Sequence, residues 1–183
     1  IEQQGVETAG VLVDDSRITT EKTRIIAGNQ QIVRVDTEEL RVVDQAIVRK
    51  LKHLLESEAE AGSLAAIIVE DYAKGLIHHE ILETVTAIGT RHRILVAQDP
   101  HPGNAAFVKG MTLLTPNRSE AFMMAGAFNC PAVYPIEADA PLLDVVKRLQ
   151  ERFEPKYLLI TLGKGGMALF HNGNHALHIP TQA

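Results

Sequence analysis

The chain has 183 residues, a formal net charge of −5 and a single cysteine, Cys130. Its 45% hydrophobic and 22% charged residues are typical of a soluble globular protein with room for one sizeable core. The sequence has no basic run and no apolar stretch of membrane-spanning length, so a nucleic-acid partner and a membrane span are both disfavoured. One cysteine excludes an internal disulfide and favours a reducing, cytoplasmic location.

The first part of the chain, residues 1–38, is predicted to form β structure. It contains β-branched segments at 11–13, 23–26 and 31–35, and the turn signal Gly28-Asn29 would join the last two in a hairpin. The hairpin residues are polar enough to indicate an exposed or partner-covered sheet.

From Glu38 onward, the apolar spacing becomes that of a helix, which is predicted to end at Gly62. The apolar run Leu64–Val69 then predicts a strand buried on both faces. The remaining pattern predicts helices over 79–88, after Asn117 and after Asp139, and strands over 94–97, 111–114, 157–161, 167–170 and 175–179. Buried strands that alternate with helices favour βαβ units and a parallel sheet.

The stretch Asn117-Arg-Ser-Glu120 follows one of these strands. An Asn at the N-cap with a Glu three residues later is the pairing of a capping box, because each side chain can satisfy a backbone N–H at the start of a helix. Taken alone, the motif indicates a helix start, and a ligand site is the alternative interpretation.

Polar residues follow four of the predicted strands, at 70–75, 98–104, 115–120 and 161–166. Ligands of open α/β sheets bind beside the carboxyl ends of the strands. These segments therefore favour a site for a polar ligand, although loops are polar in general.

Three side chains in the first two segments allow two interpretations each. Asp71 could cap its loop or hydrogen-bond a hydroxylated substrate, and Asp99 could cap a loop or support a metal–phosphate network. Lys74 could bind a substrate phosphate or simply be solvated.

The last segment has the pattern Thr161-x-Gly163-x-x-Gly166. Its hydroxyl, its bare glycine backbone and Lys164 can together approach a phosphate. The segment is neither a P-loop nor a dinucleotide fingerprint, because a strand rather than a helix follows it. Taken alone, it is better interpreted as a tight β-hairpin turn.

Three of the eight histidines, His171, His175 and His178, fall in the hairpin that follows this turn. No cysteine accompanies them and their spacing fits no zinc motif, so metal ligation by histidine is disfavoured. The sequence also lacks the G-x-S-x-G elbow of a hydrolase.

Taken in order, these stretches resemble the ribokinase-like (PfkB) sugar kinases, and among them the heptose-7-phosphate kinases. The Asn-x-x-Glu and Thr-x-Gly-x-x-Gly motifs are shared by the wider family. The heptose branch is indicated by Asn29-Gln-Gln-x-x-Arg-x-Asp36 and Asp71-Tyr-Ala-Lys-Gly75. Residues 22–27, 113–120 and 177–183 also match, so that the resemblance spans nearly the whole chain.

The resemblance implies a three-layer ribokinase-like parallel sheet with helices on both faces. Residues 1–38 would be part of a β lid that covers the sugar and pairs subunits in a homodimer. Residues 39–183 would form the central part of the nucleotide- and sugar-binding domain.

The resemblance also implies transfer of the ATP γ-phosphate, with Mg²⁺, to the anomeric hydroxyl of D-glycero-D-manno-heptose 7-phosphate, in ADP-heptose and lipopolysaccharide core synthesis. The implied nucleotide and phosphate residues are Asn117, Glu120, Thr161, Gly163, Lys164 and Gly166. The implied metal residues are Glu120, Asn117 and Asp99, and the implied substrate residues are Asp71, Lys74 and Arg24.

Two features depart from the family pattern. Where the heptose branch often has Asp-Pro-Lys, this chain has Asp99-Pro-His101, and a neutral His is a weaker phosphate partner than Lys. The Gly-Ala-Gly-Asp motif that carries the general base is expected beyond Ala183, and the chain begins with Ile1 rather than Met.

We therefore expect a fragment of a longer kinase, with the N- and C-terminal parts of the domain missing and no activity of its own. A kinase for another sugar is one alternative. A non-catalytic nucleotide-binding or subunit-interaction module on the same fold is another.

Overall fold

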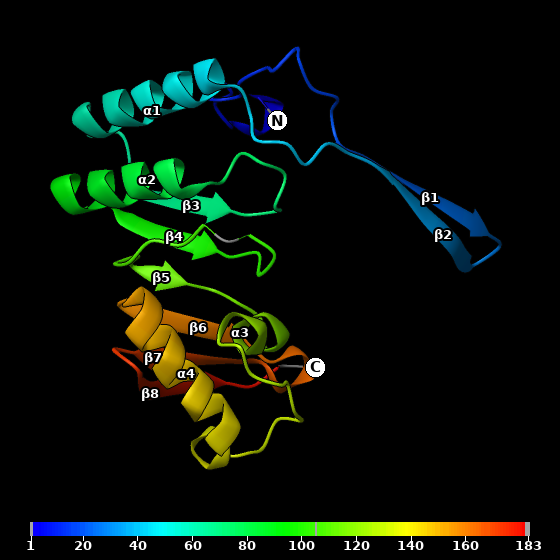
Figure 1. Cartoon of the computed structure of the whole chain (residues 1–183), viewed down its shortest axis with the longest axis vertical. Coiled ribbons are helices and arrows are strands. Elements are labelled where there is room, and N and C mark those ends of the chain that lie inside the picture. Colours follow the sequence, from blue (N-terminus) through cyan, green and yellow to red (C-terminus); the bar gives the residue numbers. More distant parts are fainter. Residues whose placement is uncertain (1, 105, 182–183) are drawn as a thin grey trace.

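The computed structural model describes residues 2–104 and 106–181, so Ile1 and the last two residues of the matching stretch 177–183, Gln182 and Ala183, lie outside the described residues. A β-hairpin projects from an α/β domain (Figure 1). The hairpin strands are β1 (Glu21–Ala27) and β2 (Gln30–Thr37). The sheet of the domain contains β3 (Ala66–Glu70), β4 (Leu95–Asp99), β5 (Leu113–Leu114), β6 (Tyr157–Thr161), β7 (Met167–His171) and β8 (Asn174–Ile179). The helices are α1 (Gln45–Glu60), α2 (His79–His92), α3 (Arg118–Met124) and α4 (Ala140–Phe153), with 3₁₀ turns η1 (Glu2–Gln4), η2 (Ile136–Ala138) and η3 (Gly163–Gly165).

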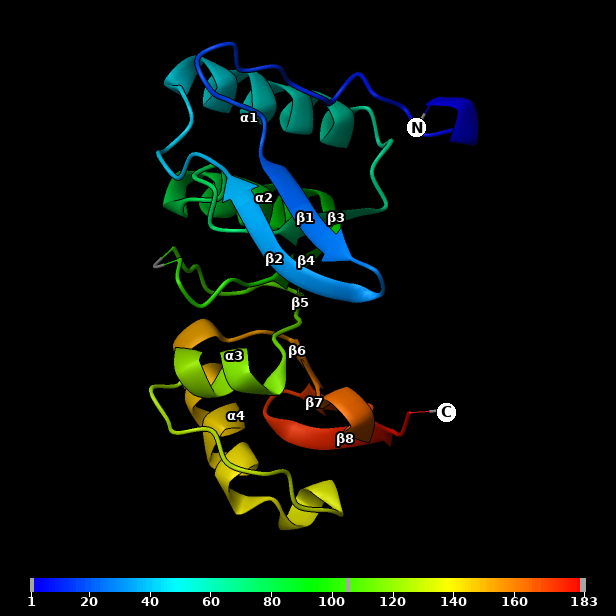
Figure 2. The ribbon, with the colours of Figure 1, turned by 90° about the vertical axis from the view of Figure 1, so that its right-hand side faces the viewer.

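The six strands lie side by side in chain order. Strands β3 to β6 are parallel, and β7 and β8 extend the sheet in antiparallel fashion. The carboxyl ends of the parallel strands therefore line one edge of the sheet. The hairpin projects from the same side, and Figure 2, which looks toward that side, shows β1 and β2 in front of β3 and β4.

One face of the sheet carries the hydrophobic core. The register places Ile67 beside Val96 and Leu158 beside Phe170, and all four side chains are buried. Ile67 and Val96 pack with residues of α1 and α2, whereas Leu158 and Phe170 pack with residues of α3 and α4. Because each such side chain contributes about 1.5–3 kcal/mol when buried, this face holds the helices onto the sheet.

No helix among the described residues packs against the opposite face of the sheet. Ile68 of β3 is 70% exposed, Leu95 of β4 is 43% exposed and Leu177 of β8 is 50% exposed. The prediction that residues 64–69 form a strand buried on both faces is therefore wrong for the described chain, since the helices pack only against the face that carries Ile67. The ribokinase-like α/β class is confirmed, but a helical layer on the second face is not found among residues 2–104 and 106–181.

Local signals set most of the helix boundaries. Asp139 caps α4 by accepting a hydrogen bond from the N–H of Leu142, as predicted. Helix α1 begins later than predicted, because its N-cap is Asp44 and Leu40 lies outside it, 60% exposed. The predicted β segment 11–13 is wrong, since these residues belong to no strand.

The predicted hairpin is confirmed, and its two faces differ in polarity. Thr23 pairs with Val35 and Ile25 with Val33, which places their side chains on one face. Lys22, Arg24, Arg34 and Asp36 occupy the alternate positions on the other face. In the parts of the chain that the structure describes, the helices are all too short or too polar to traverse a bilayer.

Candidate functional site

A pocket of about 330 Å³ lies at the carboxyl ends of the parallel strands. It is lined by six polar side chains: Glu70, Asp99, Thr115, Asn117, Glu120 and Thr161. Glu70, Asp99 and Thr161 are the last residues of β3, β4 and β6, and Thr115 directly follows β5. Every parallel strand therefore contributes to one site, as the polar strand ends in the sequence predicted.

The register of the strands brings these side chains together. Glu70 pairs with Asp99 across β3 and β4. The Thr115 hydroxyl donates to Asp99 Oδ1 at 3.3 Å, and a short parallel bridge joins Asn117 to Thr161. The pocket is thus held by backbone pairing rather than by flexible loops.

Asn117 and Glu120 form both halves of the predicted capping box. The N–H of Glu120 donates to Asn117 Oδ1 at 3.0 Å, and the N–H of Asn117 donates to Glu120 Oε2 at 2.7 Å. Both side chains also line the pocket, so one pair of residues begins α3 and faces the site.

The donor set of the pocket consists of oxygen ligands, which Mg²⁺ prefers. No three His, Cys, Asp or Glu side chains in the described ranges lie close enough together to hold a metal ion by themselves. Mg²⁺ usually keeps several waters and binds through one or two carboxylates together with substrate phosphates. The carboxylates of Asp99 and Glu120, with the Asn117 amide, fit that mode.

The glycine turn follows Thr161 and surrounds η3. Gly163 has φ +58°, and a Cβ added there would meet open space. Gly166 has φ +83°, and a Cβ would lie 2.0 Å from the Ile179 carbonyl oxygen. The hairpin of β7 and β8 therefore requires glycine at 166 for its own packing, whereas glycine at 163 borders free space next to exposed Lys164.

Asp71 lies outside this pocket and is bonded both to its own loop and to the loop after β4. Its Oδ1 accepts from the N–H of Ala73 at 2.8 Å, and its Oδ2 accepts from Asn104 Nδ2 at 2.7 Å. Asp71 is only 9% exposed. The structure thus shows a role of Asp71 in holding these loops, and its contact with substrate stays a prediction.

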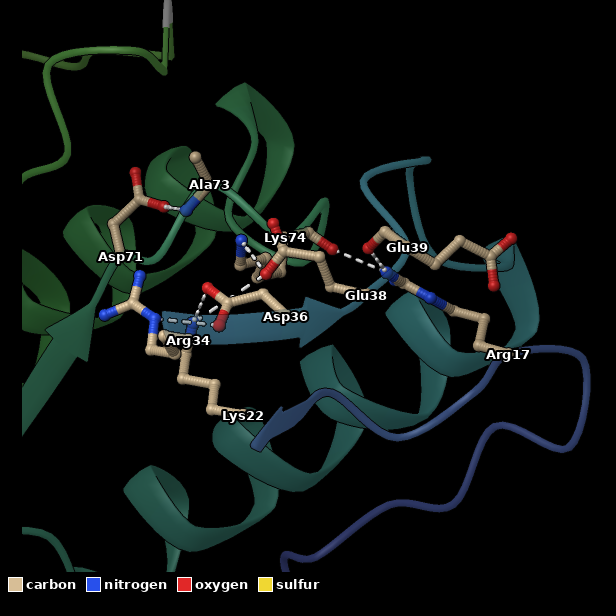
Figure 3. A network of polar contacts seen from close by, with 9 residues as sticks. All are labelled: Arg17, Lys22, Arg34, Asp36, Glu38, Glu39, Asp71, Ala73 and Lys74. Atoms are coloured by element: carbon tan, nitrogen blue, oxygen red, sulfur yellow. Dashed lines mark hydrogen bonds and ion pairs between the residues drawn. The ribbon is translucent and has the colours of Figure 1, made fainter. Parts of the chain in front are cut away.

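Lys74 and Arg24 also lie away from the pocket, near or on the hairpin. Lys74 Nζ lies 2.5 Å from Glu38 Oε2 at the root of the hairpin. Arg17 Nη2 donates to the carbonyls of Glu39 and Lys74, both at 2.7 Å (Figure 3). These contacts tie the hairpin root to the loop after β3.

An ion-pair network continues onto the polar face of the hairpin. Asp36 is bonded by Lys22 at 3.0 Å and by Arg34 at 2.8 Å (Figure 3). Hydrogen bonds from Lys22 and Arg34 lower the pKa of the Asp36 carboxyl. Arg24 lies opposite Arg34 in the register, so two guanidinium groups share this face.

Two pocket residues, Glu70 and Thr115, were not singled out from the sequence. Their position could have identified them, because Glu70 ends β3 and Thr115 directly follows β5, just as the predicted site residue Asp99 ends β4. His101 does not line the pocket, and its Nδ1 accepts from the N–H of Gly103 at 3.1 Å.

The fold and the pocket place the chain among open α/β proteins whose ligands bind beside strand carboxyl ends. The sequence profile described as "pfkB family carbohydrate kinase" matches residues 1–183, and the chain belongs to this family.

Curated relatives match almost the whole chain but are much longer. "Bifunctional protein HldE" of Geotalea uraniireducens is 37% identical over 98% of this chain. The protein of the same name from Helicobacter acinonychis is 37% identical over 97%. The chain spans 35% of the first relative and 36% of the second, about a third of their length.

Solved structures share the fold at low identity. Escherichia coli phosphofructokinase-2 in complex with potassium superposes with a TM-score of 0.61 at 12% identity, covering 90% of this chain and 50% of that chain. Arabidopsis thaliana ribokinase complexed with ribose and ATP gives a TM-score of 0.51 at 16% identity, covering 84% of this chain and 45% of that chain.

Proposed function

We propose that the complete polypeptide containing this chain is an ATP-dependent sugar kinase. Its acceptor is the anomeric hydroxyl of D-glycero-D-manno-heptose 7-phosphate, which places it in ADP-heptose and lipopolysaccharide core synthesis in the cytoplasm. The observation that carries the proposal is the convergence of Asp99, Asn117, Glu120 and Thr161 in one pocket at the ends of the parallel strands. Membership of the carbohydrate kinase family supports the reaction class. The heptose assignment rests on the stretches 29–36 and 71–75.

Phosphoryl transfer needs positioning and charge neutralisation more than covalent chemistry by the protein. Bound Mg²⁺ would neutralise phosphate charge, and Asp99, Asn117 and Glu120 would hold it through its waters. Glu120 is oriented for this role by its bond to the Asn117 N–H, so the capping box fixes the carboxylate before ligand arrives.

The nucleotide phosphates would lie over the glycine turn. Thr161 supplies a hydroxyl at the rim of the pocket, and Lys164 supplies positive charge on the turn itself. The open space at Gly163 allows close approach of an anion to the backbone. Gly166 keeps the turn tight against β8.

The sugar would lie between the pocket and the hairpin, with residues 1–38 as the lid and residues 39–183 as the central part of the domain. Arg24 would reach the sugar phosphate from the polar face of the lid. Lys74 would bind the same phosphate in competition with Glu38, its present partner. Asp71 would bind a sugar hydroxyl through its carboxylate while keeping its loop bonds. The apolar face of the lid would pair with a second copy in a homodimer.

The general base is expected beyond Ala183, so we expect this chain to be inactive alone. A kinase for a different sugar is the first alternative. The second is a non-catalytic nucleotide-binding or subunit-interaction module on the same fold.

The test is ADP release by the full-length protein with Mg·ATP and heptose 7-phosphate, with ribose and fructose 6-phosphate as control acceptors. Release with the heptose well above the controls is expected, and equal release would refute the heptose assignment. Asp99→Asn should lower the activity about 10–100-fold, as loss of a metal-supporting carboxylate does. Asp144→Asn, on the exposed face of α4, is the matched control and should keep full activity.

A further inference from the structure

A tyrosine and a histidine that were not among the predicted site residues contact the glycine turn. His178 Nε2 lies 2.8 Å from the carbonyl oxygen of Gly165, the middle glycine of the turn. A carbonyl only accepts, so the proton is on Nε2 and His178 donates. The Thr181 hydroxyl donates to the Gly163 carbonyl at 3.3 Å. Side chains from β8 and the residues that follow it therefore hold two carbonyls of the turn.

Tyr134 supports this histidine and covers the turn. Its ring stacks on His178 with centroids 5.5 Å apart and an interplanar angle of 26°. A Cβ added to Gly165 would lie 1.6 Å from the Tyr134 hydroxyl oxygen. Gly165 is not among the glycines with positive φ, so the close neighbours of the added Cβ, Tyr134 first and Leu162 second, are what favour glycine there.

We propose that Tyr134 and His178 are positioning residues that hold the glycine turn in the shape that receives the nucleotide phosphates. The inference rests on the proposed function, because it assigns a role within the same site. The His178 and Thr181 side chains fix the carbonyls of Gly165 and Gly163 from the β8 side, and this orients the peptide units of the turn. A turn fixed before binding loses less entropy when the ligand arrives.

Nucleotide affinity should therefore depend on the His178 hydrogen bond. In the full-length protein, His178→Ala should weaken Mg·AMP-PNP binding about three- to tenfold, the range for loss of one neutral hydrogen bond. His178→Gln, which can present an amide N–H at the Nε2 position, should restore most of this affinity. In assays of ADP release, the KM for ATP should rise while kcat changes little.

The chain contains a matched control. Tyr157 and His171 form a similar stacked pair, with centroids 4.9 Å apart and an interplanar angle of 23°. This pair lies at the opposite end of β6 and β7 from the turn. His171→Ala should leave nucleotide affinity unchanged. An equal loss in His171→Ala, or wild-type affinity in His178→Ala, would overturn the proposal.

Amide hydrogen exchange separates this proposal from the proposed function. His178→Ala should speed exchange at residues 163–166 without ligand, and His171→Ala should not. If the wild-type protein is folded but binds no nucleotide, the proposed function is refuted, and so is the role of Tyr134 and His178 in nucleotide binding. If nucleotide binds but exchange in His178→Ala matches wild type, the positioning role alone is refuted.

Discussion

Arg118 Nη1 lies 2.8 Å from Asp139 Oδ2 in a buried ion pair beneath the helix that begins at the candidate site. Asp139 is fully buried and also accepts from the N–H groups of Val133 and Leu142. Arg118 further donates to the Cys130 carbonyl at 3.1 Å. The motif Asn117-Arg-Ser-Glu120 therefore has two sides, one toward the pocket and one anchored in the core.

Removal of one partner would leave a buried charge without compensation. We expect Arg118→Leu to lower the free energy of unfolding by about 3–5 kcal/mol, measured by urea denaturation. Arg148→Leu is the control, because Arg148 forms an exposed ion pair with Asp144 at 2.7 Å and should cost less than about 1 kcal/mol. An equal decrease in the free energy of unfolding in the two variants would show that the buried ion pair stabilises the fold no more than an exposed one.

The same pair predicts a pH dependence of stability. Burial opposes ionisation of Asp139, but the hydrogen bonds from Arg118, Val133 and Leu142 outweigh it and lower the pKa below its ordinary value of 3.8. A depressed carboxyl pKa contributes stability above the unfolded-state pKa, and the contribution is lost as pH falls through the folded-state pKa. The unfolding free energies of wild type and Asp139→Asn should differ by a constant amount at pH 5–7. This difference should shrink below pH 3.8. A constant difference down to acid pH would contradict the ionised, bonded state of Asp139.

Substitution by alanine should change stability differently at Gly163 and at Gly166. Gly166→Ala combines a sparsely populated backbone conformation, with φ +83° and ψ −127°, with a clash against the Ile179 carbonyl. It should therefore destabilise the hairpin by more than the backbone strain of about 1–3 kcal/mol alone. Gly163→Ala carries the strain without the clash, so its thermal melting should change less. If the proposed function is right, Gly163→Ala should still weaken Mg·AMP-PNP binding. A lower melting temperature for Gly163→Ala than for Gly166→Ala would contradict the close packing of Gly166 against Ile179.

The apolar face of the hairpin should mediate self-association. Val33 is 44% exposed and Val35 is 49% exposed, on a two-stranded sheet that projects away from the core (Figure 1). Val33→Asp should convert a dimer of the full-length protein into a monomer in light-scattering measurements. Val13→Asp, at a more exposed position (74%) outside the hairpin, should leave the dimer intact. A monomeric wild type would refute the homodimer.

The sequence predicted well those features that depend on neighbouring residues. The capping box at Asn117, the cap at Asp139 and the strand Tyr157–Thr161 all follow from local side-chain chemistry or local periodicity. It predicted poorly what depends on distant partners. Ile68 sits in an apolar run, but whether it is covered depends on which faces the helices reach, and here it is exposed.

The same limit applies to the site. Asp99, Asn117, Glu120 and Thr161 were found because strand ends converge in an α/β sheet, while Glu70 was passed over at an equivalent strand end. Tyr134 carried no sequence signal, and His178 was noted only among the hairpin histidines and in the matching stretch 177–183. The role of both residues comes from contacts with a turn more than ten residues away from each. Such contacts arise only once the chain is folded.

Asn117→Asp should separate the capping role from the ligand role. Aspartate caps a helix about as well as asparagine, so the unfolding free energy should stay within about 1 kcal/mol of wild type. The new carboxylate joins Glu70, Asp99 and Glu120 around the pocket and would repel the anionic nucleotide. Mg·AMP-PNP affinity should therefore fall about tenfold in titration calorimetry, in the range of charge effects near a phosphate. Asp44→Asn exchanges the same side chains at the cap of α1, away from the pocket, and should leave affinity unchanged. Wild-type affinity in Asn117→Asp would mean that Asn117 serves only the helix.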